Sequence, residues 1–423
     1  MKKCLNIAAV SRTTYWQGMR GGMDVHGKLL AKGLADRGHR VIFICTRHPE
    51  GKVADIEDGV ELHYLPDTVF GSRRHGWADK SVQVLEALHL EQPFDLVWSQ
   101  SFDGFGLSRK GVSWVTQLPL LATLHGCIAQ EFASFIENLR RHWFHSIFFS
   151  RGLAGLFYSY FVSQRPLLRH ADRIITVSRK VAEDLFKWYG RAIAGKCVTV
   201  YNGVDTTIFH PDEEARKRIR RRFELTPEIV LLLSLGRLTH EKGHHLLIEA
   251  MTHLRKKDHP VKLMIVGEGE DAGHLQTLVK QFSLDDHVIF TGPVDNHETA
   301  SFYNAADLFL FPTLTVEGLP FVILEAMACG IPIIASDLGG NREAIRNGED
   351  GILIPPGSSR RIVTEIEALI CDRARTNRLR MNALGKIHQT FSLIRMLDRM
   401  EEEMLITAGL REASGHSRHF SGQ

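Results

Sequence analysis

The sequence predicts an α/β protein with two doubly wound, Rossmann-like domains that face each other across a cleft. Two observations predict this fold class. Short apolar runs alternate with amphipathic helical segments, and this alternating pattern starts twice along the chain. Strands that are apolar along their whole length are typical of parallel sheets that helices cover on both faces. The 423 residues also exceed what one hydrophobic core usually supports.

The first start is an apolar strand over residues 5–10, followed by a glycine-bearing loop over 18–22 and a helix over about 23–37. The dipeptide Gly38-His39 ends that helix. Further strands of the first half are expected at 40–45, 96–99, 120–124, 174–177 and 197–200.

The second start repeats this order about 220 residues later. A strand over 229–235 leads into a Gly236-Arg237 loop and a helix over about 243–256. Further strands of the second half are expected at 261–266, 288–291, 307–312 and 333–335.

These two starts define the expected domains. Residues 1–205 form an N-terminal domain and 227–410 a C-terminal domain, whose last helix either stays there or returns to the first. Residues 206–226 form a basic linker region that interrupts the pattern. The tail over 411–423 is rich in Ser, Gly and His, which predicts disorder.

Composition excludes several classes of protein. A formal net charge of +3 is too small to indicate nucleic-acid binding. The basic run over 216–222 is interpreted as a solvated helix face, with an RNA- or membrane-binding surface as the less favoured alternative. Six scattered cysteines argue against a disulfide scaffold and a zinc site, and indicate a reducing compartment. The first apolar run is too short for a secretory signal, so we expect a cytoplasmic protein.

An aromatic and basic stretch over 140–169 contains the segment that comes nearest to a transmembrane helix, 143–162. Arg151 and His145 interrupt that segment, so it is not a clean transmembrane helix. We favour a buried pair of helices, and the alternative is an interfacial segment that docks on anionic lipid.

Two glutamates, Glu317 and Glu325, flank the start of a predicted helix. The strand run over 307–312 precedes them, and Pro320 is expected in the first turn of the helix, where its missing N–H costs nothing. A helix start presents unpaired backbone donors and a positive dipole end, which favour phosphate. Carboxylates can accept hydrogen bonds from sugar hydroxyl groups. Two of them beside a phosphate-binding helix start therefore predict a nucleotide-sugar site.

Four further clusters follow predicted strands or open predicted helices, at the edge where doubly wound domains bind ligands. Arg237 and Lys242 place two cations on one loop. The other clusters are Gly21 to His26, Thr123 to Gly126 and Tyr201 to Asp205.

These motifs together resemble the retaining, metal-independent glycosyltransferases of family 4, which have the two-domain GT-B fold. The resemblance covers most of the chain. Its other matching elements are Asn202 to Asp205 with Phe209 and Pro211, Val266 to Gly269, Gly339 to Glu343, and Gly351 to Gly357. Each motif is weak alone, and their combination in this order is specific.

The resemblance implies a catalytic role for four residues. Arg237 and Lys242 match the family's diphosphate ligands, and Glu317 matches the acid that touches the donor sugar. His125 matches the histidine of the first domain that binds a sugar hydroxyl. The competing interpretations are ordinary surface ion pairs for the cations, a dipole-favoured acid for Glu317, and a structural role for His125.

The resemblance also implies a set of donor-binding residues. Glu325 matches the acid that binds the ribose hydroxyls, and an exposed helical position is its alternative. Gly22 matches a loop glycine that approaches the donor phosphate, and Gly292 and Val294 fall where the family holds the base. The remaining donor-binding residues are Gly318, Leu319 and Pro320.

The expected reaction is transfer of a hexosyl unit from a nucleotide-diphosphate sugar to an acceptor hydroxyl, with retention of configuration. No metal is expected, because no Asp-x-Asp follows a predicted strand. The resemblance also implies no cofactor, with the nucleotide-diphosphate sugar as co-substrate. The acceptor is a glycan or a lipid-linked sugar of envelope or exopolysaccharide synthesis, with peripheral contact at the inner face of the plasma membrane as a further expectation. The alternatives are a nucleotide-sugar epimerase, a phosphorylase with pyridoxal phosphate, and a silent carbohydrate-binding subunit.

Overall fold

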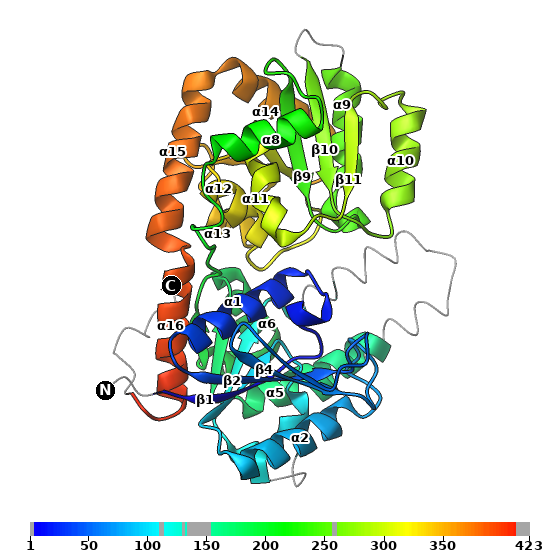
Figure 1. Ribbon diagram of the computed structural model, residues 1–423. Coiled ribbons are helices and arrows are strands. Elements are labelled where there is room, and N and C mark those ends of the chain that lie inside the picture. The colour runs from blue at the N-terminus through cyan, green and yellow to red at the C-terminus, as the bar shows by residue number, and fades with distance from the viewer. Residues whose placement is uncertain (1–3, 110–113, 129–131, 133–153, 256–259, 412–423) are drawn as a thin grey trace. The chain divides into compact units, whose positions relative to one another are not determined.

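The computed structural model describes residues 4–109, 114–128, 132, 154–255 and 260–411 (Figure 1). The chain divides into two compact units. The first contains Met1–Asn202 and Met396–Gln423, and the second contains Gly203–Arg395. Of the predicted tail, only Arg411 is among the described residues. Residues 140–153 of the aromatic and basic stretch also lie outside the described residues.

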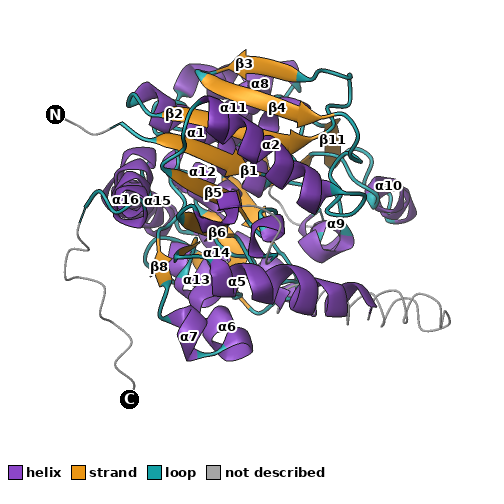
Figure 2. Ribbon diagram, turned by 90° about the horizontal axis from the view of Figure 1, so that it is seen from below, coloured by secondary structure: helices purple, strands orange, loops and turns teal. Residues whose placement is uncertain are grey.

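The first unit is built on an eight-stranded sheet with the order β3-β4-β2-β1-β5-β6-β7-β8. Figure 2 shows these strands following one another across the unit. Every pair is parallel except β3 with β4. The strands are β1 (Asn6–Val10), β2 (Arg40–Thr46), β3 (Ala54–Glu57), β4 (Val60–Leu65), β5 (Leu96–Gln100), β6 (Leu120–Leu124), β7 (Arg173–Thr176) and β8 (Cys197–Thr199).

The helices of the first unit connect these strands. Ser178 caps one of them, α6, by accepting a hydrogen bond from the Val181 amide. Among the described residues, the α-helices that connect these strands are α1 (Gly22–Asp36), α2 (Trp77–Glu91), α5 (Arg165–His170), α6 (Arg179–Tyr189) and α7 (Arg191–Ala194). Shorter elements are η1 (Tyr15–Gln17), η2 (Phe105–Ser108), η3 (Trp114–Gln117) and the π-helical η4 (Tyr158–Gln164).

The last helix, α16 (Leu393–Thr407), belongs to the first unit from Met396 onward. Two of its buried acids are paired with arginines from distant parts of that unit. Arg37 donates to Glu401 at 2.6 Å, and Arg173 donates to Glu403 at 2.6 Å. Because an unpaired buried charge is costly, these pairs fix where the returning helix docks.

The second unit is built on a fully parallel sheet with the order β11-β10-β9-β12-β13-β14. When the six strands are numbered 1 to 6 along the sequence, this order is 3-2-1-4-5-6, which is the Rossmann arrangement. The direction of the strand order reverses between β9 and β12, and this position is the switch point of the sheet. The strands are β9 (Val230–Leu235), β10 (Val261–Val266), β11 (Val288–Gly292), β12 (Leu308–Phe311), β13 (Ile333–Ser336) and β14 (Ile352–Ile354).

Helices of the second unit cover this sheet around a core of Leu, Ile and Val side chains. Leu232, Leu263 and Ile265 of the central strands are at most 1% exposed. The helices are α8 (Glu213–Arg222), α9 (His244–Leu254), α10 (Ala272–Gln281), α11 (Asn296–Ala305), α12 (Phe321–Ala328), α13 (Asn341–Ala344), α14 (Ser359–Cys371) and α15 (Arg373–Thr390), with the 3₁₀ turn η5 (His240–Lys242).

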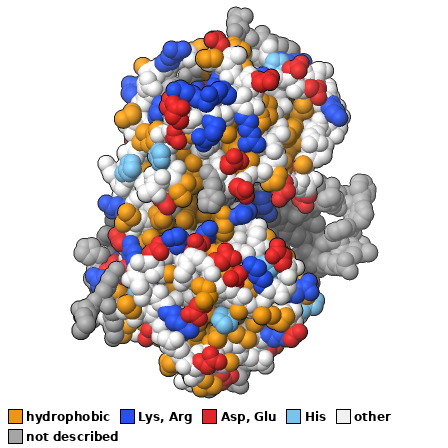
Figure 3. All heavy atoms as spheres, in the orientation of Figure 1, with side chains coloured by type: hydrophobic (Ala, Val, Ile, Leu, Met, Phe, Trp, Pro, Cys, Tyr) orange, Lys and Arg blue, Asp and Glu red, His pale blue; other side chains and the backbone are white. Residues whose placement is uncertain are grey.

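The basic run expected in the linker region lies on α8, inside the second unit. Arg216 donates to the Ala306 carbonyl at 2.9 Å and to Asp307 at 2.6 Å, and Arg220 is 7% exposed and donates to the Ala305 carbonyl. These cations satisfy carbonyls at the end of α11. The expectation of a solvated face is therefore wrong for Arg216 and Arg220. Other Lys and Arg side chains still gather on the surface over α8 (Figure 3).

The predicted strands are all present, with ends that differ by at most a residue or so from those expected. Three strands were not predicted: β3, β4 and β14. Among the described helices, none has the length and apolar character needed to cross a membrane.

Candidate functional site

The loops that follow β9 and β12 meet at the switch point of the second sheet. The Leu314 amide donates to the Glu241 carbonyl at 2.7 Å, which joins the two loops through their backbones. Nζ of Lys242 lies 2.5 Å from Oε1 of Glu317. Arg237 lies on the same loop as Lys242 and is exposed. The structure thus brings two of the four residues predicted to be catalytic, Lys242 and Glu317, into contact, and a third, Arg237, lies on the same loop as Lys242.

A glycine allows this close approach. Gly243 has a φ of 75°, and a Cβ built on it would lie 2.1 Å from the Pro312 carbonyl oxygen. Any larger residue here would push the loop after β9 away from the loop after β12. Gly243 also ends η5, so it fixes the position of Lys242 directly before it.

Helix α12 begins immediately after the Glu317 loop. Pro320 is its N-cap rather than part of its first turn, and the helix starts at Phe321. Glu325 is therefore the fifth residue of the helix, just over one turn after its start. Gly318 and Leu319 precede the cap, so the loop runs directly into the helix start that attracts anions.

Glu325 has a partner that the sequence did not indicate. The Tyr303 hydroxyl, on α11, donates to Oε2 of Glu325 at 2.8 Å. Burial raises the pKa of Glu325 to about 7, and the Tyr303 hydrogen bond opposes that shift. The carboxyl group therefore changes charge close to neutral pH.

Gly292 and Val294 lie at the end of β11 and in the loop that follows it. This strand is at the edge of the sheet, with β10 between it and β9. Gly292 has a φ of 71°, which favours glycine. One strand, β10, therefore lies between β11 and the strand that precedes Lys242, and two strands, β10 and β9, lie between β11 and the strand that precedes Glu317.

In the first unit, His125 follows β6 and lies against a second histidine. The ring centroids of His125 and His26 are 4.7 Å apart, at an angle of 78°. Burial lowers the pKa of His125 to about 4, and Nε2 of His125 is buried without a hydrogen-bond partner among the described residues. The imidazole is therefore neutral at pH 7, with a polar atom that a ligand hydroxyl could satisfy.

His26 and Gln100 complete this cluster. His26 lies on α1 in the turn after Gly22, which is exposed at the start of that helix. Gln100 ends β5, and its Nε2 donates to the Met23 carbonyl at 2.7 Å. The position of His26 in the first helix was visible in the sequence, and its contact with His125 was not.

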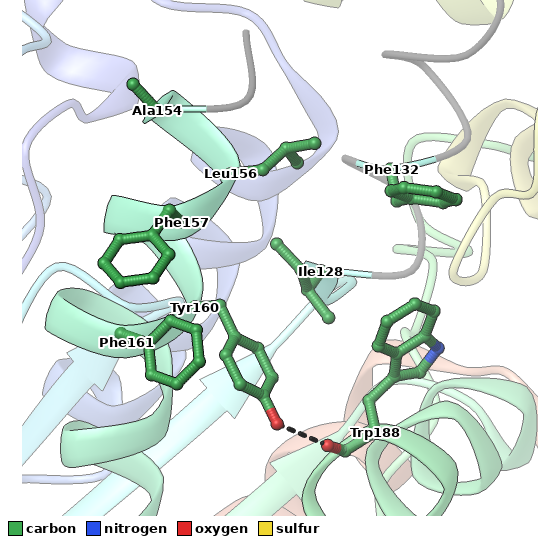
Figure 4. Close-up of a pocket in the computed structure, with 8 residues that line it drawn as sticks. All are labelled: Ile128, Phe132, Ala154, Leu156, Phe157, Tyr160, Phe161 and Trp188. Atoms are coloured by element: carbon green, nitrogen blue, oxygen red, sulfur yellow. Dashed lines mark hydrogen bonds between the residues drawn. The ribbon is translucent and has the colours of Figure 1, made fainter. Parts of the chain in front are cut away.

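The first unit also has an open apolar groove of about 680 Å³ (Figure 4). Two residues that line it, Phe157 and Phe161, are 63% and 48% exposed. The Tyr160 hydroxyl donates to the Trp188 carbonyl at 2.8 Å and joins its two sides. The groove is lined by Ile128, Phe132, Ala154, Leu156, Phe157, Tyr160, Phe161 and Trp188.

Comparison with known proteins identifies the family. Residues 20–208 match the model of Glycosyltransferase Family 4, and residues 215–386 match that of Glycosyl transferases group 1. A D-inositol 3-phosphate glycosyltransferase of Catenulispora acidiphila is 30% identical over 362 residues, which cover 80% of this chain and 79% of that relative. The chain belongs to the group 1, family 4 glycosyltransferases. Its two Rossmann-like units are those of the GT-B fold.

Another relative of this glycosyltransferase is matched over a shorter stretch. A GDP-mannose-dependent α-(1-6)-phosphatidylinositol monomannoside mannosyltransferase of Mycobacterium tuberculosis is 35% identical over 190 residues. That match covers 44% of the chain and 49% of the relative, so the chain spans about half the length of that relative.

Solved structures agree with the fold. Anabaena HepE, crystallised with UDP and glucose, has a TM-score of 0.74 at 20% identity, over 95% of this chain and 99% of that one. A sucrose-phosphate synthase of Thermosynechococcus elongatus has a TM-score of 0.76 at 21% identity, over 96% of this chain and 100% of that one.

Proposed function

We propose that the chain is a retaining glycosyltransferase that moves a hexosyl unit from a nucleotide-diphosphate sugar to an acceptor hydroxyl, with neither metal nor cofactor in catalysis. One observation carries the proposal. Lys242, on the loop that also carries Arg237, meets Glu317 at the switch point of the second sheet, shortly before the start of α12. Cations, a carboxylate and a helix N-terminus are the groups that a diphosphate joined to a sugar requires.

The proposed roles follow from where charge develops. The leaving diphosphate gains negative charge during transfer, so Arg237 and Lys242 stabilise the transition state more than the ground state. Glu317 binds hydroxyls of the sugar, and Glu325 binds those of the ribose. The remaining donor contacts are assigned to Gly22, Gly292, Val294, Gly318, Leu319 and Pro320.

We propose that retention occurs on the front face of the sugar. The bond from the anomeric carbon to the leaving phosphate oxygen breaks while a bond to the acceptor oxygen forms on the same face. The acceptor proton passes to that phosphate oxygen, and His125 orients the reacting groups through a sugar hydroxyl. Covalent trapping of a glycosyl-enzyme, detected by mass spectrometry, would rule this mechanism out in favour of two displacements.

We propose a lipid-linked acceptor, bound by the first unit. The apolar groove with exposed Phe157 and Phe161 could hold acyl chains. The mycobacterial relative is named for a glycolipid acceptor, which supports this class. Such an acceptor would bring a cytoplasmic enzyme to the inner face of the plasma membrane as a peripheral protein. Co-sedimentation with anionic vesicles is expected, and its absence would favour a soluble glycan.

The function can be tested with purified full-length chain and a panel of nucleotide sugars. GDP-mannose and UDP-hexoses are offered with lipid-linked and soluble acceptors, in the presence of a chelator. We expect glycoside formation with the donor's anomeric configuration by NMR, and its loss in Glu317→Gln. Donor epimerised without any acceptor would instead show an epimerase. If calorimetry detects no binding of any nucleotide sugar, the result would favour the alternative of a catalytically silent carbohydrate-binding subunit.

Donor affinity is expected to depend on pH through Glu325. Its pKa of about 7 leaves much of the carboxyl group protonated near neutrality. Ribose hydroxyls donate to the ionised form, so donor binding lowers this pKa. Affinity should therefore rise by about tenfold from about pH 6 to about pH 8 and then level off. Titration calorimetry of wild type and Glu325→Gln checks this, because the glutamine variant should lose the dependence. A flat wild-type profile would refute the ribose assignment.

A further inference from the structure

Two histidines and an aspartate cluster beside the loop that carries Lys242. His240 lies in η5, His245 lies in the first turn of α9, and Asp271 lies in the loop after β10. Their potential ligand atoms all lie within 4.8 Å of one another. We infer that His240, His245 and Asp271 form a binding site for a divalent transition-metal ion of the Zn²⁺ class.

The donor set fits such an ion. Imidazole nitrogen and carboxylate oxygen bind Zn²⁺ at about 2.0–2.2 Å, which places tetrahedral ligand atoms about 3.4 Å apart. Because the two imidazole rings are stacked, one of them must rotate out of the stack before both ring nitrogens can face one ion at that distance. Nδ1 of His240 is buried and has no hydrogen-bond partner among the described residues. A buried ring nitrogen of that kind calls for a partner, and a metal ion would provide one.

The backbone already holds the three residues in place. The rings of His240 and His245 stack at 4.3 Å with an angle of 4°, on either side of the Gly243 turn. The Asp271 amide donates to the Leu238 carbonyl at 2.9 Å, which ties the aspartate to the same loop. The three ligand residues therefore lie on segments that the backbone already joins, so binding requires an imidazole ring to reorient and not the ordering of a whole loop.

Occupation of this site would cross-link the loop after β9 to the loop after β10. The first of these loops carries Arg237 and Lys242, so the ion would hold both proposed diphosphate ligands in one arrangement. This consequence rests on the proposed function, whereas metal binding itself does not. The ion would act by restricting the loop to that arrangement and would not be a reactant, so the proposed metal-free transfer step is compatible with it.

Metal binding is tested on chelator-treated full-length protein. Titration with Co²⁺ should give a saturable visible spectrum for about one ion per chain, without a thiolate charge-transfer band, and calorimetry should show Zn²⁺ binding. His245→Ala and Asp271→Asn should each weaken binding by at least tenfold, since even loss of an outer-shell partner costs about 10–100-fold. The matched control is His274→Ala, an exposed histidine on α10 that should bind as wild type. Affinity unchanged in both ligand variants, or no saturable spectrum, would overturn the site.

The effect on donor binding is measured by calorimetry with and without Zn²⁺. We expect donor affinity to rise by about fivefold or more when the site is occupied, and the rise to vanish in Asp271→Asn. Equal affinity in both states would overturn the coupling. Failure to bind any nucleotide sugar in either state would count against the proposed function, while the cobalt spectrum would still decide the metal site.

Discussion

Replacement of Lys242 by alanine is expected to reduce the turnover of sugar transfer by about 10²–10³-fold, the usual cost of removing one group that stabilises transition-state charge. The Nζ of Lys242 lies 2.5 Å from Oε1 of Glu317, and the Lys242 side chain is 17% exposed. In the alanine variant, water that enters this space would not supply an equivalent positive charge. The expected loss should fall mainly on kcat, because the leaving diphosphate is more charged in the transition state than in the bound donor. Steady-state kinetics with the best donor of the panel measure it.

A double-mutant cycle separates this role from the ion pair with Glu317. If Lys242 acted only by positioning Glu317, Lys242→Ala in a Glu317→Gln background would cost nothing further. We expect a further loss, because the diphosphate charge persists after the carboxylate is removed. Lys280→Ala, an exposed lysine on α10 of the same unit, is the matched control and should leave kcat unchanged. Wild-type kcat in Lys242→Ala would refute the assignment.

The architecture was predictable because its strands are buried on both faces. A fully apolar run such as 261–266 has few alternatives to a central parallel strand, and β10 has those bounds. Strand β3, in contrast, is an edge strand in which Ala54 and Ile56 are exposed, so no burial pattern distinguishes it from a loop. The antiparallel pair that it makes with β4 was missed for this reason.

The arrangement of the candidate site was predictable only for residues that follow strands lying next to each other at the switch point. Lys242 and Glu317 are 75 residues apart, and the strand order alone brings β9 beside β12. The Tyr303 contact with Glu325 joins two helices and depends on side-chain direction, which the sequence does not reveal. His26 meets His125 for the same kind of reason, so both partners were found only in three dimensions.

Gly340→Ala is expected to have the second large effect, through the loop that carries Glu317. The Gly340 amide donates to the Glu317 carbonyl at 3.0 Å. A Cβ added to Gly340 would lie 1.7 Å from the Gly318 carbonyl oxygen, a contact with backbone that no side-chain rotation relieves. The loop before α12 must move, so donor binding should fall below detection and the free energy of unfolding of the second unit should drop by about 1–3 kcal/mol or more.

Urea unfolding and donor calorimetry on the same samples test this expectation, with Gly385→Ala as the matched control. Gly385 lies inside α15, and a Cβ added to it meets no atom within 4 Å. Alanine there should raise stability by about 1 kcal/mol, because glycine is a poor helix former, and should leave donor binding unchanged. If Gly340→Ala lowers the free energy of unfolding while Gly385→Ala raises it, the loss of stability in Gly340→Ala comes from the contact with Gly318 and not from the added methyl group itself. Donor affinity retained by Gly340→Ala would mean that the loop carrying Glu317 tolerates displacement, and its role in donor recognition would then be wrong.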